Sequence, residues 1–264
     1  MYADHIGRTE TRTARVRPPL PHDLAAALDR SVPEASPALR RRVLFQDGRP
    51  RRGGFLPPVH DLPRRMWAGG RVRFHAGSIL HAGDEATRTG TIADTSDEAG
   101  AFGRLVRVTV RHGIAGPAGL AITEEQDPVC RGTHGAAVEQ ATPVPPAPGH
   151  AFRAEVAPDS VPLFRCSAPT GNGRRSRSAS DDATRHEGHP GLVVSGPLRA
   201  TWLAEPLARH RPGRRIASSG SRGRRPAFAA RPMAPEGWDS GDALRPRTPE
   251  ADGAVCMDAE VERG

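Results

Sequence analysis

The residues with the clearest chemical potential lie in one stretch, 163–210, where a loop rich in Gly, Asn, Arg and Ser leads into an apolar segment at 191–194. Ser195-Gly196-Pro197 follows that segment and opens a helical pattern. A polar residue and a Gly before a Pro at the first helical position are typical of a helix start. Because the free N–H groups of such a start can receive an anion or a developing oxyanion, we predict that site at Gly196.

The loop before this helix carries basic side chains that can bind anions. Arg174, Arg175 and Arg177 lie within four positions, and guanidinium groups pair with phosphate or carboxylate oxygens. A solvated basic loop is the alternative for the same residues. His186 and His189 are three residues apart, but the sequence supplies no third ligand nearby, so we predict solvated loop histidines and no metal site.

Several long blocks of the chain resemble the MaoC-like hydratases of the hot-dog fold, and within them the branch that acts on 3-methylfumaryl-CoA, the C4 thioester of mesaconate. In and after the loop, the matching pieces are Asn172-Gly173, Ala183-Thr184, Glu187-Gly188, 190–194 and Gly196-Pro197-Leu198. Upstream, the matching blocks are 50–59, 62–70, 107–112 and 124–127. The resemblance covers most of residues 50–225 and implies an acyl-CoA thioester as the substrate, with no cofactor.

The resemblance also implies where the chemistry takes place. Hydration of a double bond conjugated to a thioester needs a base for water, an acid for the alpha carbon and donors for the enolate oxygen. Asn172 matches the first catalytic position of this branch, whereas Arg177 stands where the family has its His, and Ser195 stands where a His usually precedes the Gly. Arg stays protonated near neutral pH and cannot accept a proton from water.

We therefore expect a hydratase with impaired activity. The expected site has Asn172, Arg177 and Gly196 as catalytic positions, and its substrate-binding residues are Gly173, Arg174, Arg175 and Pro197. Pro206 lies inside the helical pattern, where an interior Pro costs roughly 3 kcal/mol, and predicts a kink or an end there.

The strand signals divide into two regions. Val106, Val108 and Val110 alternate with polar residues, as Val72 and Phe74 do, and this period is typical of half-buried antiparallel strands. Residues 60–130 thus predict a small antiparallel sheet, and pieces at 215–219 and 255–259 predict a second. Four prolines between residues 143 and 148 indicate an extended linker.

The predicted fold class is α+β. The resemblance implies a double hot-dog in which two antiparallel sheets are each wrapped on a helix, with irregular Pro-, Gly- and Arg-rich segments. We expect a flexible arm at 1–20, an N-terminal hot-dog-like unit at 21–133, a Pro-rich linker at 134–150 and a C-terminal hydratase unit at 151–264. Residues 24–28 predict a short helix, and residues 230–252 show no clean period and predict a poorly formed tail.

Composition leaves another class of protein open. The 264-residue chain has a net charge of +8 and no Lys, so its 38 basic residues are all Arg. Such basicity fits a partly disordered nucleic-acid binder. The abundance of residues with GC-rich codons and the absence of a nucleic-acid-binding motif favour the hydratase, or a catalytically inactive paralogue that binds CoA thioesters.

The cysteines and the N-terminal sequence indicate the cellular location of the protein. Cys130, Cys166 and Cys256 are widely spaced and odd in number, so a disulfide framework is not expected. The N-terminus has no apolar core, and no run reaches the roughly 18 apolar residues of a membrane span. We expect a soluble cytoplasmic protein with no membrane and no specific nucleic-acid partner, and a homodimer stays open.

Overall fold

A computed structural model of the chain describes residues 2–16, 45, 55–100, 103–132, 149, 151–167, 170, 173–210 and 216–264. The chain divides into two compact units, 1–17 with 47–137 and 18–46 with 138–264. The helix expected at 24–28 lies outside the described residues, as does nearly all of the linker expected at 134–150.

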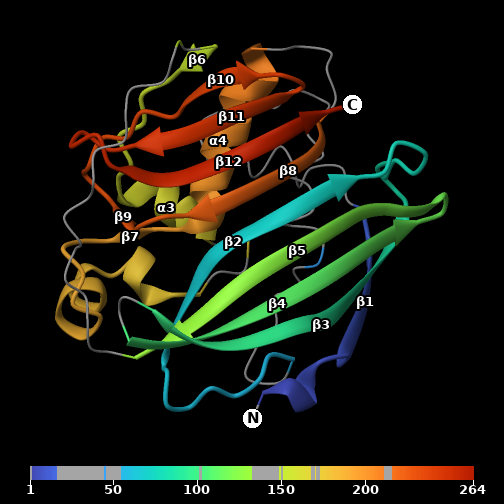
Figure 1. The fold of residues 1–264 in the computed structure, drawn as a ribbon, viewed down its shortest axis with the longest axis horizontal. Helices are drawn as coiled ribbons and strands as arrows, with labels where there is room; N and C mark the ends of the chain where they lie inside the picture. Colours follow the sequence, from blue (N-terminus) through green and yellow to red (C-terminus); the bar gives the residue numbers. More distant parts are fainter. Residues whose placement is uncertain are drawn as a thin grey trace. The chain divides into compact units, whose positions relative to one another are not determined.

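The N-terminal unit is an antiparallel sheet in the strand order β1-β3-β4-β5-β2 (Figure 1). A 3-10 helix, η1 (Ala3–His5), precedes the strands β1 (Thr9–Arg15), β2 (Arg64–Phe74), β3 (Glu85–Gly100), β4 (Gly103–Gly116) and β5 (Gly119–Arg131). The predicted antiparallel sheet at 60–130 is confirmed. It forms because alternate side chains of β4, Val106, Val108 and Val110, reach one face and are at most 4% exposed there. Ile92, Val59 and Leu62 complete that core.

The segment expected to be a flexible arm is a strand, so that prediction is wrong for Thr9–Arg15. The β1 strand pairs with β3 along its whole length, and the hydroxyl groups of Thr11 and Thr89 lie 3.3 Å apart across the pair. The sequence did not indicate it because both faces of β1 carry polar residues. Thr is nevertheless β-branched and favours extended backbone.

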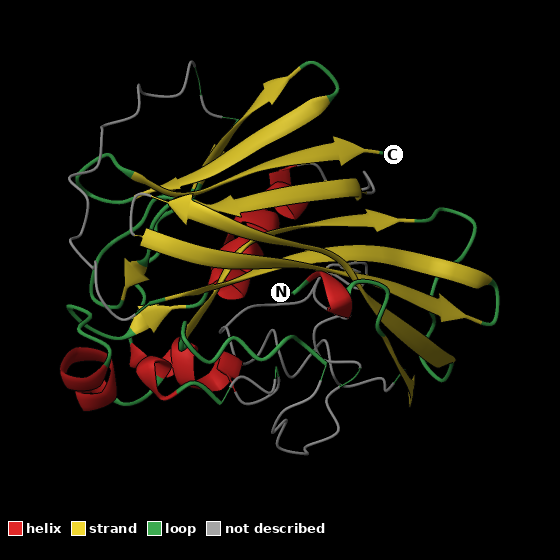
Figure 2. Ribbon diagram, turned by 60° about the horizontal axis from the view of Figure 1, so that its bottom comes forward, coloured by secondary structure: helices red, strands yellow, loops and turns green. Residues whose placement is uncertain are grey.

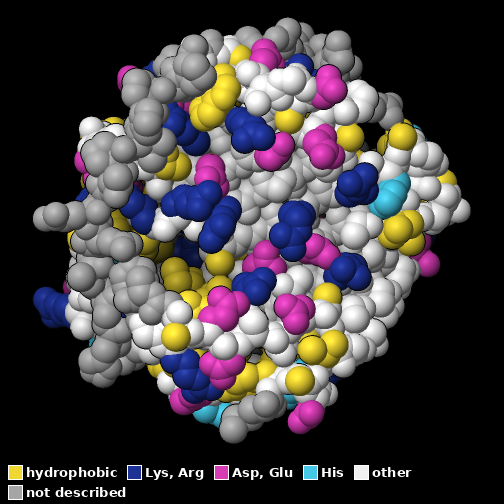
Figure 3. All heavy atoms as spheres, in the orientation of Figure 1, with side chains coloured by type: hydrophobic (Ala, Val, Ile, Leu, Met, Phe, Trp, Pro, Cys, Tyr) yellow, Lys and Arg dark blue, Asp and Glu magenta, His cyan; other side chains and the backbone are white. Residues whose placement is uncertain are grey.

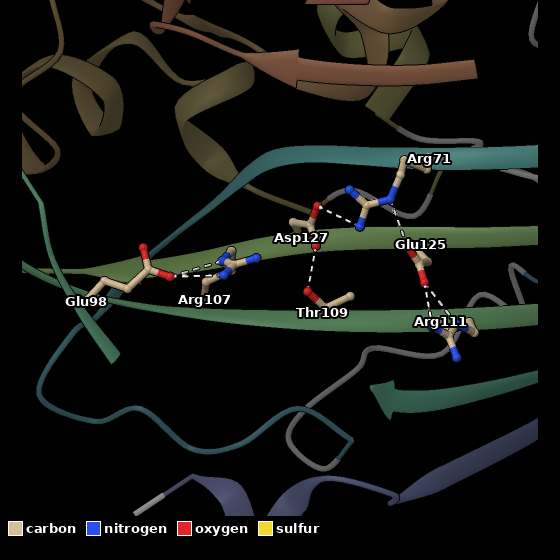
Figure 4. A network of polar contacts seen from close by, with 7 residues as sticks. All are labelled: Arg71, Glu98, Arg107, Thr109, Arg111, Glu125 and Asp127. Carbon is tan, nitrogen blue, oxygen red and sulfur yellow. Dashed lines mark hydrogen bonds and ion pairs between the residues drawn. The ribbon is translucent and has the colours of Figure 1, made fainter. Parts of the chain in front are cut away.

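The opposite face of this sheet carries a network of charged side chains (Figure 4). Glu125 on β5 accepts hydrogen bonds from Arg71 on β2 at 2.8 Å and from Arg111 on β4 at 2.9 Å. Asp127 on β5 accepts a hydrogen bond from Thr109 at 2.8 Å. Basic and acidic side chains are interspersed over the surface seen in Figure 3. These arginines are thus already matched by carboxylates, and cross-strand pairs of this kind help fix the strand register.

The C-terminal unit combines a second antiparallel sheet with helices. Its sheet order is β8-β12-β11-β10-β6, formed by β6 (Phe152–Arg153), β8 (Ile216–Gly223), β10 (Glu236–Ser240), β11 (Ala243–Pro249) and β12 (Val255–Arg263). The α4 helix (Gly196–His210) contacts β11 and β12, and Figure 2 shows it beside the strands. The strands predicted near 215–219 and 255–259 are confirmed as β8 and β12.

Residues 230–252 contain the strands β10 and β11 where the sequence predicted a poorly formed tail, so that prediction is wrong. The β10 and β11 strands pair antiparallel, with Glu236 opposite Arg247. A buried ion pair joins these two side chains. Charged residues thus occupy buried strand positions where apolar residues are usual, which is why the sequence showed no strand period here. Among the described residues, no helix is long and apolar enough to cross a membrane.

Candidate active site

The start of α4 has the geometry that the sequence predicts. The Ser195 hydroxyl accepts the N–H of Leu198 at 3.2 Å, and the Ser195 carbonyl accepts the N–H of Arg199 at 3.0 Å. Ser195 is therefore the N-cap residue. Pro197 has no N–H, so Gly196, which is buried, supplies the first-turn N–H that neither the cap nor the first helical bond uses.

Buried side chains fix the position of this helix start. Leu198 and Trp202 are 2% and 5% exposed and pack against Leu163 and Cys166 of α3 (Ser160–Ser167). Val194 of β7 (Val193–Val194), which pairs with β9 (Ala227–Phe228), belongs to the same core. The prediction of a helix end at Pro206 is wrong, because the helical backbone continues to His210, and the alternative of a kink there stays a prediction.

Removing the cap tests how firmly the helix start is held. Ser195→Ala is expected to lower the free energy of unfolding by about 1 kcal/mol, because the N–H of Leu198 loses its acceptor at a buried position. Urea unfolding followed by circular dichroism measures it. Ser178→Ala, at an exposed position of the preceding loop, is the control, and equal effects of the two substitutions would contradict the cap.

The loop before α4 folds into two short helical turns. These are η2 (Arg175–Arg177) and the π-helical turn η3 (Asp182–His186). The η2 turn contacts η3, α3 and β7, so it lies beside the strand that leads directly into Ser195. The loop therefore packs beside the strand that precedes the helix start.

The expected binding residues of the loop differ in their surroundings. Asn172 lies outside the described residues, and Gly173 is exposed. The side chain of Arg175 is 78% exposed and forms an ion pair with Asp182 at 2.5 Å, so its charge is already matched. Arg174 is half-buried and has an interaction partner of its own.

Arg177 differs from its neighbours because its guanidinium is enclosed. Its Nε and Nη1 atoms are inaccessible to solvent and have no hydrogen-bond partner among the described residues. The pKa of Arg177 is lowered to about 10. Burial is the largest cause and the charges of Arg174 and Arg199 add to it, while Cys166 and Glu187 act in the opposite direction. The group remains a cation at neutral pH, which agrees with the argument that it cannot accept a proton.

Arg199 is a site residue that the sequence reasoning missed. It is 5% exposed in the first turn of α4, and its Nη1 donates to the carbonyl oxygens of Arg225 at 2.9 Å and Cys256 at 2.6 Å. Its Nε has no partner among the described residues. A signal was present, since Arg199 lies on the same helical stripe as the apolar residues Leu198, Trp202 and Leu203.

The two loop histidines have carboxylate partners. His189, with 12% of its side chain exposed, lies 3.2 Å from a Glu187 oxygen and packs its ring against Phe228. His186 is 74% exposed and lies 3.4 Å from Asp182. Of the two, His189 is the enclosed one, and its partner Glu187 is close enough to act on the pKa of Arg177. In the part of the chain that the structure describes, no group of His, Cys, Asp and Glu side chains has the arrangement of a metal site.

An antiparallel sheet packed on a helix, as in the C-terminal unit, is typical of the hot-dog class of proteins, and solved structures support this fold. A MaoC-like dehydratase from Phytophthora capsici superimposes with a TM-score of 0.74 at 14% identity, covering 100% of this chain and 98% of that one. A Mycobacterium tuberculosis protein described as a double hotdog fold gives 0.61 at 12% identity, covering 100% and 98%. At these identities the likeness establishes the fold alone.

Sequence comparison places the chain more closely. The model of hydroxyacyl-thioester dehydratase type 2 matches residues 35–229, and the chain belongs to this MaoC-like family. A relative from Chloroflexus aurantiacus, named mesaconyl-C(4)-CoA hydratase, is 42% identical over 229 residues, which are 86% of this chain and 80% of the relative. The resemblance recognised in the sequence is thus confirmed.

Proposed function

We propose that this protein hydrates a short unsaturated acyl-CoA thioester, with 3-methylfumaryl-CoA as substrate and a hydroxyacyl-CoA of the citramalyl-CoA type as product. The reaction is expected to be slow. The observation that carries the proposal is the Ser195-capped start of α4, in which neither the cap nor the first helical bond uses the N–H of Gly196. The preceding strand, β7, contacts η2 of the loop. The name of the Chloroflexus relative supports the choice of substrate.

The chemistry assigns a role to each proposed residue. As water adds at the beta carbon, negative charge develops on the thioester oxygen, and the N–H of Gly196 stabilises it. Asn172 keeps the catalytic position that the family resemblance assigns to it, Gly173 and Pro197 bind the acyl group, and Arg174 and Arg175 bind phosphate groups of the CoA. Arg177 binds an anion and does not transfer protons, so the group that the family uses as acid and base is missing here.

The proposed architecture follows the double hot-dog. In it, units at 21–133 and 151–264 each wrap an antiparallel sheet on a helix, and residues 134–150 link them. The contacts of α4 with β11 and β12 support this arrangement for the second unit. A cytoplasmic location and a homodimer belong to the same proposal.

A catalytically inactive paralogue that binds CoA thioesters is the second candidate. The enclosed guanidinium of Arg177 favours it, because this group cannot take a proton from water. The structure gives less support to the alternative of a nucleic-acid-binding protein. Arg71, Arg107 and Arg111 on the N-terminal sheet are paired with Glu125 or Glu98 and so contribute little unmatched positive charge.

The test mixes purified protein with 3-methylfumaryl-CoA and follows the loss of absorbance of the conjugated thioester. A product heavier by one water is expected, with kcat about 10²–10⁴-fold below that of ordinary hydratases, the share usually supplied by a general acid or base. Binding of the substrate without turnover would favour the inactive paralogue. Failure to bind any CoA thioester would contradict both candidates.

A further inference from the structure

Two arginines, Arg177 of η2 and Arg199 in the first turn of α4, have enclosed guanidinium atoms that lack the acceptors their environment requires. Nε and Nη1 of Arg177 and Nε of Arg199 are inaccessible to solvent and have no hydrogen-bond partner among the described residues. Buried donors of this kind are normally satisfied, because leaving one unmatched is costly. Two guanidinium groups in one enclosed place therefore call for a bound acceptor.

The position of Arg199 is set by the protein itself. Its Nη1 is held by the carbonyl oxygens of Arg225 and Cys256, at 2.9 and 2.6 Å, so the guanidinium is fixed before any ligand arrives. The side chain belongs to the first turn of α4 and is 5% exposed. A group fixed in this way loses little conformational freedom on binding.

The charges around Arg177 and Arg199 are also unbalanced. Arg177 comes from η2, and both Arg174 and Arg199 are close enough to disfavour its positive charge. Glu187 opposes them, but its carboxylate already lies 3.2 Å from His189. An additional anion would lower the energy of both buried cations, and a carboxylate matches the planar guanidinium with two oxygens.

We propose that Arg177 and Arg199 together bind the free carboxylate of the acyl group, which makes the protein selective for thioesters of dicarboxylic acids. This inference rests on the proposed function. Arg199 follows Gly196 by three residues, an axial rise of roughly 4.5 Å, which is of the order of the separation between the two ends of a four-carbon diacid. The phosphates of CoA lie at the far end of the pantetheine arm and do not fit that separation.

Binding of two saturated thioesters tests the pair without any turnover. Succinyl-CoA and butyryl-CoA both carry four-carbon acyl groups, and only the first ends in a carboxylate. Isothermal titration calorimetry is expected to show succinyl-CoA binding at least about tenfold more tightly, because hydrogen bonds to charged groups are among the stronger ones. Arg177→Gln should reduce this preference to about threefold or less and leave the butyryl-CoA affinity within about twofold.

Arg185→Gln provides the matched control. It removes the same charge from the same loop, but the Arg185 side chain is 77% exposed, so the preference should persist. Arg199→Gln is the second variant, with circular dichroism to verify folding, and it too should abolish the preference.

The outcomes separate this inference from the proposed function. Equal affinity of the unmodified protein for both thioesters overturns the carboxylate site but leaves a CoA-thioester protein in place. Parallel weakening of both ligands by Arg177→Gln would assign the arginine to a CoA phosphate and would likewise overturn it. If neither thioester binds, the proposed function itself fails.

Discussion

Replacing Arg177 by His is expected to raise the turnover of 3-methylfumaryl-CoA, by up to about 10²–10⁴-fold, the usual contribution of a general acid or base. Burial lowers the pKa of the present guanidinium only to about 10, so it stays protonated and cannot activate water at neutral pH. An imidazole at this position is largely neutral there and can both accept and donate a proton. Initial rates from the thioester absorbance measure the gain.

Two further variants separate the gain of a base from the loss of the cation. Arg177→Ala removes the same cation without supplying a base, so its kcat should not rise. If Arg177 also holds the substrate carboxylate, Arg177→His should increase KM while it increases kcat. An unmodified enzyme that already matches ordinary hydratases would contradict the assignment. In that case His189→Gln would test the enclosed histidine beside Glu187 as the base.

No gain from Arg177→His would point to a wider loss. Ser178 and Ala179 also stand at positions where the family has other side chains, and Ser195 replaces a further His. Because the helix start of α4 is intact and capped, such a result would place the defect in the loop rather than in the helix. The inactive paralogue would then be the better description.

The sheets were predictable where burial is one-sided. Val106, Val108 and Val110 alternate with polar residues because one face of β4 is core, and that period is visible in the sequence. The β1 strand shows no such period, since its Thr, Glu and Arg residues are polar on both faces. Only its pairing with β3 reveals it, and pairing between distant segments leaves no local signal.

The candidate site was predictable in its backbone and less so in its charges. Ser195-Gly196-Pro197 has a local helix-start chemistry, so the capped start of α4 followed from the sequence alone. The enclosure of Arg177 did not, because burial depends on the packing of η2 against α3 and β7. Arg199 read as an ordinary polar helix residue, although its position on the apolar stripe was a usable signal.

The largest loss of stability is expected at Glu236. This residue is 2% exposed and lies opposite Arg153 of β6 and Arg247 of β11 in one row across three strands. Its carboxylate accepts hydrogen bonds from Arg247 at 2.7 Å and Arg153 at 2.8 Å. Glu236→Ala should lower the free energy of unfolding by about 3–5 kcal/mol, because Arg247 would remain buried without a counter-charge.

The control for this substitution lies in the same sheet. Glu260 on β12 pairs with Arg245 at 3.6 Å, but both side chains are more than half exposed, at 56% and 52%. Glu260→Ala should change the unfolding free energy in urea by about 0.5 kcal/mol or less, since water screens such pairs. Equal losses at the two sites would show that Glu236 acts only through strand propensity.

Arg153 is 51% exposed and can turn to solvent when Glu236 is removed. The penalty should therefore fall mainly on Arg247, whose guanidinium is confined over the ring of Trp238. Removing that charge as well, with Glu236→Ala and Arg247→Met combined, should therefore recover a large part of the loss.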